Sequence, residues 1–155
     1  MKISSNNNRD LKERIIENFL NKYTTYKVGI KNCYQQLDYM LPSLTAKYDS
    51  DGMSASYYIA NDTERVALDR ITSKRALDLL EEIEQYKLII TLIDNALAEI
   101  DEKQKSFVEH RYFEGLKMYE VKAKMNIAEE KTLYRIRRQV LDKFTISLSG
   151  LTSLK

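Results

Sequence analysis

Five basic residues gather near the C-terminal end of the chain, with one acidic residue, Asp142, among them. They are Lys131, Arg135, Arg137, Arg138 and Lys143. Positions 131, 135 and 138 follow the i, i+4, i+7 spacing that places side chains on one face of a helix. Ammonium and guanidinium groups arranged in this way can neutralise phosphates and reach base edges in the DNA major groove. The spacing therefore predicts a nucleic-acid-binding stripe, and an ordinary solvated helix face is the alternative.

The helix that would carry this stripe has an apolar opposite face. From Glu129 to about Phe144 its inner positions are Leu133, Ile136, Val140 and Phe144. An apolar face of this kind packs on a core and leaves the basic face outside. The pattern therefore predicts a half-buried helix whose exposed side is basic.

Two shorter helical blocks precede this helix. They span residues 101–112 and 117–125, and Asn126, Ile127 and Ala128 then interrupt the pattern. A short helix, a brief turn and a longer helix, supported by a preceding helix, form a helix-turn-helix. We therefore expect a helix-turn-helix domain over residues 100–144, followed by a C-terminal tail, 145–155.

The same segment resembles a known sequence pattern. The matching stretches are residues 107–116, 119–121, 126–127 and 132–135, and Arg111 to Gly115 read Arg-Tyr-Phe-Glu-Gly. They resemble region 4 of bacterial σ70-type factors, in which this pentapeptide links the first helix to a helix-turn-helix that reads promoter DNA. Over the whole chain the resemblance is closer to small phage-encoded transcriptional regulators of the ArpU/RinA type. This likeness implies a sequence-specific DNA-binding transcription regulator of phage or prophage late genes, such as packaging and lysis genes.

The resemblance and the position of each residue together imply roles. Lys131, Thr132 and Arg135 lie early in the last helix, the part that enters the groove, and are candidates for contacts to bases. The candidates for phosphate contacts on double-stranded DNA are Lys117, Tyr119, Arg137 and Arg138. For Tyr134, stacking and covering the core both remain open.

Two positions differ from the family pattern. Lys122 stands where the second helix usually has a small alanine that packs against the last helix. We expect either that the lysine buries its stem and keeps its ammonium group in water, or that the helix is slightly rotated. Ala128 stands near the usual place of a capping serine. Without that cap, the last helix loses about 1 kcal/mol of helix stability.

The N-terminal region, residues 1–99, is predicted to be helical. Apolar residues recur at steps of three and four from Leu11 to Leu41, and Pro42 is expected to end this first helix. An irregular connection follows. The run from Asn61 to Glu64 then has the composition of a capped start of a second helix.

The second helix carries an apolar heptad seam. Its members are Leu79, Ile83, Tyr86, Ile90, Ile93, Leu97 and Ile100. A 3.5-residue repeat of this kind keeps one stripe facing a partner helix. The partner is either the same helix of a second chain, giving a homodimer through the 79–100 seam, or the first helix folded back as a hairpin. The sequence leaves both open.

Composition limits both the fold and the function of the 155-residue chain. Apolar residues make up 43%, whereas the chain has only 4 Gly and 1 Pro. This favours an all-α fold, with an N-terminal long-helix hairpin or coiled coil followed by the C-terminal helix-turn-helix domain. Cys33 and His110 are the only cysteine and histidine, so we expect no disulfide, zinc site or His-based triad.

The sequence also carries no phosphate loop, nucleophile motif or long apolar run. We therefore expect no enzyme activity and no cofactor or metal. The absence of an apolar run of about 18 residues predicts a cytoplasmic protein without a membrane partner. The main alternative function is a σ-like protein-interaction module that acts on RNA polymerase or another regulator.

Overall fold

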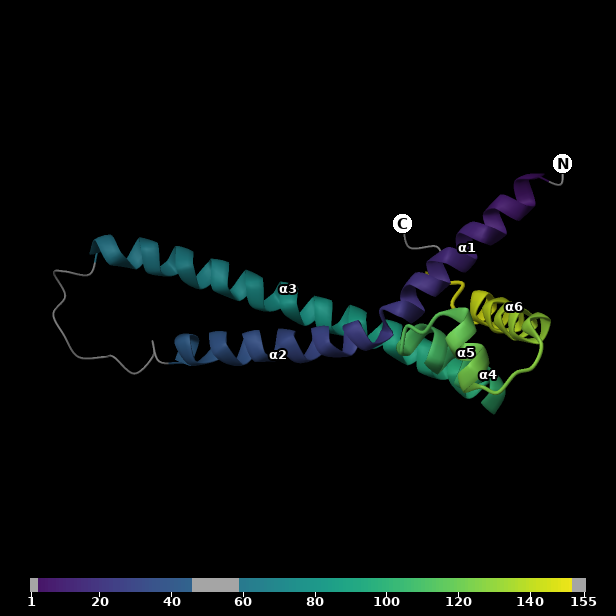
Figure 1. Cartoon of the computed structure of the whole chain (residues 1–155). Helices are drawn as coiled ribbons and strands as arrows, with labels where there is room; N and C mark the ends of the chain where they lie inside the picture. Colours follow the sequence, from purple (N-terminus) through teal and green to yellow (C-terminus); the bar gives the residue numbers. More distant parts are fainter. Residues whose placement is uncertain (1–2, 46–58, 152–155) are drawn as a thin grey trace. The chain divides into compact units, whose positions relative to one another are not determined.

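The structure of the chain, a computed structural model, describes residues 3–45 and 59–151, with side chains placed for residues 9–40, 67 and 69–151. These described ranges are helical and contain no strand, so the predicted all-α class is confirmed. In chain order the elements are α1 (Ile3–Asn21), α2 (Tyr23–Thr45), α3 (Ile59–Ala98), α4 (Glu102–Val108), the π-helical turn η1 (Glu109–Phe113), α5 (Met118–Lys124) and α6 (Glu130–Ser147) (Figure 1).

The chain forms two compact units. The first, which we call the bundle unit, comprises Met1–Tyr26 and Leu88–Lys155, and the second, the two-helix unit, comprises Lys27–Lys87. The sequence placed the boundary at residues 99 and 100. The structure differs, because α1 and the last turns of α3 belong with the C-terminal helices.

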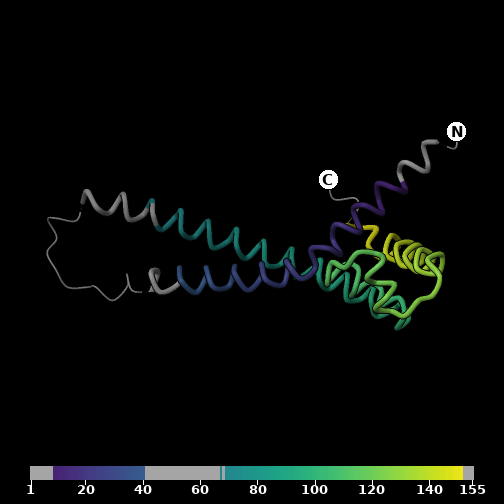
Figure 2. The backbone as a smooth tube through the Cα atoms, viewed as in Figure 1, coloured from purple at the N-terminus to yellow at the C-terminus, as the bar shows by residue number. Residues whose placement is uncertain are grey.

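Hydrophobic burial explains this division. Ile16 and Leu20 of α1 and Ile93 of α3 are completely buried in the same core as Phe107 and Phe144. Figure 2 shows α1, in purple, passing close to α6, in yellow, in agreement with the contacts between these two helices. The core of the bundle unit is therefore built from both ends of the sequence.

The expected C-terminal tail also belongs to this core. The last helix continues to Ser147, and Leu148 and Leu151 beyond it are 1% and 4% exposed. Two buried leucines contribute about 1.5–3 kcal/mol each when they leave water. Residues 145–151 are therefore part of the bundle unit rather than a separate tail.

The first predicted helix is two helices in the structure. Asn21 ends α1, Lys22 lies in a turn, and Tyr23 begins α2. The break does not coincide with the boundary between the units, since Leu20 before it and Tyr23 after it are both in the core of the bundle unit. Cys33, further along α2, is in the core of the two-helix unit.

The predicted end at Pro42 is wrong, because α2 continues to Thr45. Proline removes one backbone donor, and so close to the end of a helix this costs a single hydrogen bond. The irregular connection that we expected after Pro42 lies mostly outside the described residues. The second helix begins at Ile59, two residues before the predicted start.

Side chains from α2 and α3 form the core of the two-helix unit. Cys33 and Leu37 pack with Leu79 and Ile83, which are the first two members of the predicted seam. Further along the seam, Ile93 and Ile100 are buried in the core of the bundle unit. The buried members of the seam therefore pack within the chain, in the cores of both units.

Candidate nucleic-acid interface

A tight turn joins α5 to α6. Asn126 has a φ of 53°, in the left-handed region that asparagine tolerates better than most residues. The Ile127 N–H donates to the Lys122 carbonyl at 3.0 Å, which closes the turn behind α5. The interruption predicted at residues 126–128 is therefore a defined reversal of the chain that places α6 against α5.

The start of α5 is held by a side-chain cap. The backbone N–H of Lys117 donates to the Glu120 carboxylate at 2.7 Å, as in the second half of a capping box. Lys117 and Tyr119 are both exposed at this end of α5. Their side chains are therefore accessible to a ligand.

The Arg111 to Gly115 pentapeptide closes the preceding helix, and each of its side chains has a contact. Arg111 donates to the Leu116 carbonyl at 2.9 Å, the ring of Phe113 stacks on Tyr23 at 4.3 Å, and Glu114 pairs with Lys124 at 2.6 Å. The hydrogen bond from Lys124 lowers the pKa of the Glu114 carboxyl. Gly115 has a φ of 72°, a backbone conformation that residues with a side chain rarely adopt.

Tyr112, the remaining member, connects the pentapeptide to α1. Its hydroxyl donates to the Glu17 carboxylate at 2.8 Å, and its ring is 3% exposed. Burial, reinforced by the negative charge of Glu17, raises the pKa of the Tyr112 hydroxyl. The pentapeptide therefore fixes the path into the helix-turn-helix and also holds α1 in the bundle unit.

The apolar face of α6 lies as the sequence predicted. Leu133, Ile136, Val140 and Phe144 are all buried, and they pack with Val121 of α5 in the core of the bundle unit. This fixes the rotation of α6, and residues on its opposite face must point outward.

Two of the five basic residues of α6 have partners inside the bundle unit. Arg137 donates to the Glu17 carboxylate from two nitrogens, at 3.2 and 2.8 Å. Lys143 donates to the buried amide of Gln104 at 2.9 Å. These two side chains tie α6 to α1 and α4.

The ion pair with Glu17 also favours the charged form of Arg137. Burial opposes the positive charge, but the hydrogen bond and the charge of Glu17 outweigh it and raise the pKa of the Arg137 guanidinium. Asp142, the one acidic residue in this segment, is bound by Arg9 of α1. The predicted phosphate contact by Arg137 is therefore at odds with its position, since its charge is already compensated.

The other three basic residues form an outward-facing stripe. Lys131, Arg135 and Arg138 are exposed, and in the part of the chain that the structure describes they have no ion pair or side-chain hydrogen bond. Thr132 is half-buried beside them, and Tyr134 is 48% exposed, so its ring covers the core only in part. We call Lys131, Arg135 and Arg138 the basic stripe.

The structure describes both positions at which the sequence differs from the σ70 region 4 pattern. Lys122 is half-buried, which fits a stem that packs while the ammonium group remains in water. Glu129 occupies the N-cap of α6 and its side chain makes no capping hydrogen bond. The start of α6 therefore lacks the side-chain cap whose absence the sequence indicated.

Glu17 is a functional neighbour of this region that no pattern in the sequence predicts. Its partners Tyr112 and Arg137 lie 95 and 120 residues away, and no local pattern connects them. Glu17 directly follows Ile16, which is completely buried, and this position at the edge of a buried face is no specific signal.

Among the described residues no cluster of three or more His, Cys, Asp or Glu side chains is placed to hold a metal ion. The described helices include none that is both long enough and apolar enough to cross a membrane. No protein-family model, curated protein sequence or solved structure matches the chain.

Proposed function

We propose that the chain is a sequence-specific DNA-binding transcription regulator that inserts α6 into the major groove. The observation that carries this proposal is the division of the basic residues of α6. Arg137 and Lys143 are bound within the bundle unit, whereas Lys131, Arg135 and Arg138 are exposed on one face and have no partner among the described residues. Packing of the bundle unit does not account for this row, and its alignment on one face of α6 is what a helix in the major groove requires.

The arrangement around the stripe supports contacts with a duplex. An α-helix fits the major groove, and residues near the N-terminus of the second helix of a helix-turn-helix reach base edges there. Lys131 and Arg135 lie in the first two turns of α6, and Arg138 follows one turn later. Lys117 and Tyr119, exposed at the start of α5, are suited to phosphates on one side of the groove.

The resemblance of Arg111 to Gly115 and the flanking segments to σ70 region 4 supports the same role. In the structure these residues close a helix and lead into α5, which is the place that the resemblance implies for them. Arg137 is left out of the proposed contacts because Glu17 already binds it.

Salt-dependent DNA binding by the full chain tests the proposal. A selection from a random duplex library should yield a preferred site, and affinity for that site should fall steeply with salt because bound phosphates release counterions. The variant Lys131→Ala/Arg135→Ala/Arg138→Ala should lose both the preference and most of the salt dependence. The logarithmic salt slope should decrease in magnitude by about 0.9 for each phosphate that the variant no longer neutralises.

A charge-matched control variant distinguishes binding by the basic stripe from nonspecific attraction between the positive charge of the protein and DNA. Lys12→Ala/Lys22→Ala/Lys103→Ala removes the same charge from three exposed lysines of α1, the following turn and α4. It should keep the preferred site and most of the affinity. Equal losses in both triple variants, or no selected site, would overturn the proposal and favour a module that binds RNA polymerase or another protein.

A further inference from the structure

Within the two-helix unit, α3 has a second heptad stripe on the side opposite its buried seam. Residues 70, 74, 77, 81 and 84 follow steps of four, three, four and three, which keep them on one helix face. They are Arg70, Lys74, Leu77, Glu81 and Glu84. All five are exposed, whereas Leu79 and Ile83 of the seam are buried against α2.

The centre of this outer stripe is apolar and open to solvent. Leu77 is 65% exposed, and Leu80, beside it, is 45% exposed. Next to Leu77 the surface has a shallow hollow lined also by Asp69, Arg70, Ser73 and Lys74. Large apolar side chains grouped with a hollow are a feature of protein-binding surfaces.

The charges on either side of Leu77 have opposite signs. Arg70 and Lys74 lie toward the N-terminus of α3, and Glu81 and Glu84 lie toward its C-terminus. Among the described residues Arg70, Lys74 and Glu81 have no ion pair, and Glu84 has only the exposed contact with Lys87 at 3.0 Å. An exposed pair of that kind contributes little and is readily exchanged for another.

This order of charges is complementary to itself about a two-fold axis. Arg70 and Glu84 are each seven residues from Leu77, so an antiparallel copy centred there places the arginine of one chain opposite the glutamate of the other. In the same alignment Lys74 and Glu81, which are three and four residues from Leu77, come within one residue of facing each other. Leu80 of the second copy comes over the hollow. A parallel alignment would instead place like charges together.

We infer that the chain forms an antiparallel homodimer through this outer stripe of α3. A closed two-fold interface requires a surface that matches itself, and the stripe meets that requirement in charge and in its apolar centre. The interface differs from the 79–100 seam, whose buried members face the interior. The inference does not depend on DNA binding.

Charge exchange between two variants tests the dimer, with full-length protein and without DNA. Sedimentation equilibrium of the parent should show a dimer whose dissociation constant rises with salt. Glu81→Lys/Glu84→Lys makes the stripe entirely basic, and Arg70→Glu/Lys74→Glu makes it entirely acidic. Each variant alone should associate at least tenfold more weakly than the parent, because like charges then face each other.

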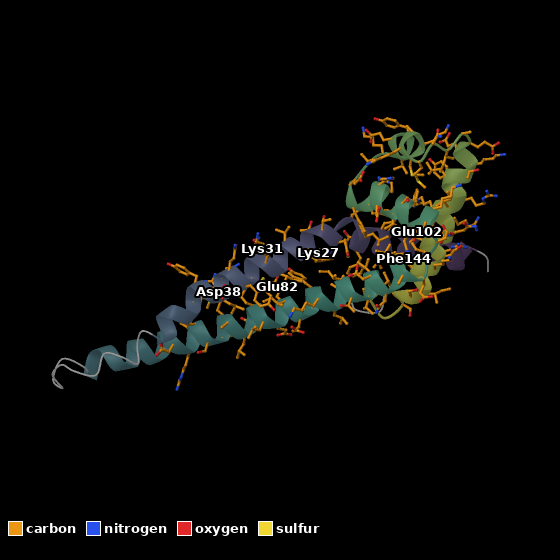
Figure 3. The ribbon with its side chains drawn as sticks, turned by 90° about the horizontal axis from the view of Figure 1, so that it is seen from below. Lys27, Lys31, Asp38, Glu82, Glu102 and Phe144 are labelled. Carbon is orange, nitrogen blue, oxygen red and sulfur yellow. The ribbon has the colours of Figure 1, made fainter. Side chains whose placement is uncertain are left out.

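Mixing the two variants is the decisive arm. The all-basic and all-acidic stripes match each other, so an equimolar mixture should regain the dimer as a heterodimer. Lys31→Glu/Arg75→Glu changes the charge by the same amount as the acidic variant at exposed positions away from the stripe, and it should dimerise as the parent does. Figure 3 labels Lys31 on α2.

A cross-linking measurement keeps the test independent of how well the charge variants fold. Leu77→Cys should be joined into a covalent dimer by a short bis-maleimide, because the two-fold axis passes next to this residue. Asp38→Cys, on the exposed side of α2 (Figure 3), should not be joined. A monomeric parent, a mixture that stays monomeric, or equal cross-linking at both positions would each overturn the inference.

Discussion

Arg137 of α6 and Glu17 of α1 are 120 residues apart in the chain, yet two guanidinium nitrogens donate to the same carboxylate oxygen, at 3.2 and 2.8 Å. The Tyr112 hydroxyl donates to that oxygen as well, at 2.8 Å. One carboxylate on α1 therefore accepts hydrogen bonds from two side chains. One belongs to the last helix, and the other belongs to the π-helical turn before the helix-turn-helix.

The first prediction concerns the contribution of Glu17 to stability. Glu17→Ala leaves Arg137 and Tyr112 without their acceptor, so the free energy of unfolding should fall by about 1–3 kcal/mol. Because the Arg137 side chain is 31% exposed, water compensates part of the loss and the lower half of that range is expected. Urea denaturation of both proteins provides the measurement.

Glu102→Ala is the matched control, since that carboxylate is 89% exposed and pairs only with Lys105 of its own helix. Its effect should remain within about 0.5 kcal/mol. A loss no larger for Glu17→Ala than for Glu102→Ala would show that the trio does not stabilise the bundle unit.

The second prediction is an alkaline pH dependence that comes from Tyr112. Burial and the Glu17 charge raise the pKa of its hydroxyl above the ordinary value of 10.0. Stability from the neutral phenol is therefore fully present below about pH 10, the value for the unfolded chain, and is lost as the pH rises above it. The loss should be about 1.4 kcal/mol for each pH unit until the phenol of the folded protein ionises.

The chain has 11 tyrosines, so the informative quantity is the difference between the parent and Tyr112→Phe. At neutral pH the variant should be less stable, because it lacks the hydrogen bond to Glu17. Between pH 10 and pH 11 the parent should lose more stability than the variant. Parallel pH profiles would show that Tyr112 ionises as easily in the folded protein as in the unfolded one.

The third prediction compares two glycines in order to distinguish the effect of backbone conformation from that of steric crowding. A Cβ added at Gly115 or at Gly150 would meet no atom within 4 Å, but only Gly115 has a positive φ, of 72°. Gly115→Ala should therefore lower the free energy of unfolding by about 1–2 kcal/mol, the cost of the left-handed region for an L residue. Gly150→Ala should be neutral or slightly stabilising, and thermal unfolding of the two variants compares them directly.

Local periodicity was sufficient to predict much of the fold. The buried positions Leu133, Ile136 and Val140 of α6 follow from a helical repeat within one segment, and so does the reversal at Asn126. The exposure of Lys131, Arg135 and Arg138 follows from the same repeat, since residues opposite an apolar face point outward.

The remaining features depend on contacts between distant segments. The sequence alone cannot tell that Arg137 binds Glu17 whereas Arg138 has no partner in the described part of the chain, because both are arginines in one basic run. Likewise, the sequence alone assigns Leu148 and Leu151 to a C-terminal tail, because their burial depends on helices from other parts of the chain. The assignment of α1 to the bundle unit rests on such contacts too, and these set the boundaries that the sequence placed elsewhere.

The last prediction, which rests on the proposed function, distinguishes three arginines of α6 by their surroundings. Arg135 lies in the second turn and is exposed, so Arg135→Ala should relax the preference at one or two base pairs, by about 1–3 kcal/mol of discrimination. Arg138→Ala should instead weaken binding to selected and random duplexes by a similar factor and reduce the salt slope by about 1. Arg137→Ala should lower the stability of the protein but leave the affinity of the folded protein nearly unchanged, because Glu17 already binds that guanidinium. Binding isotherms for a selected and a scrambled duplex at two salt concentrations, measured well below each melting temperature, separate these effects. Equal losses of affinity in all three variants would mean that α6 lies on DNA with a different rotation from the one that its buried face dictates.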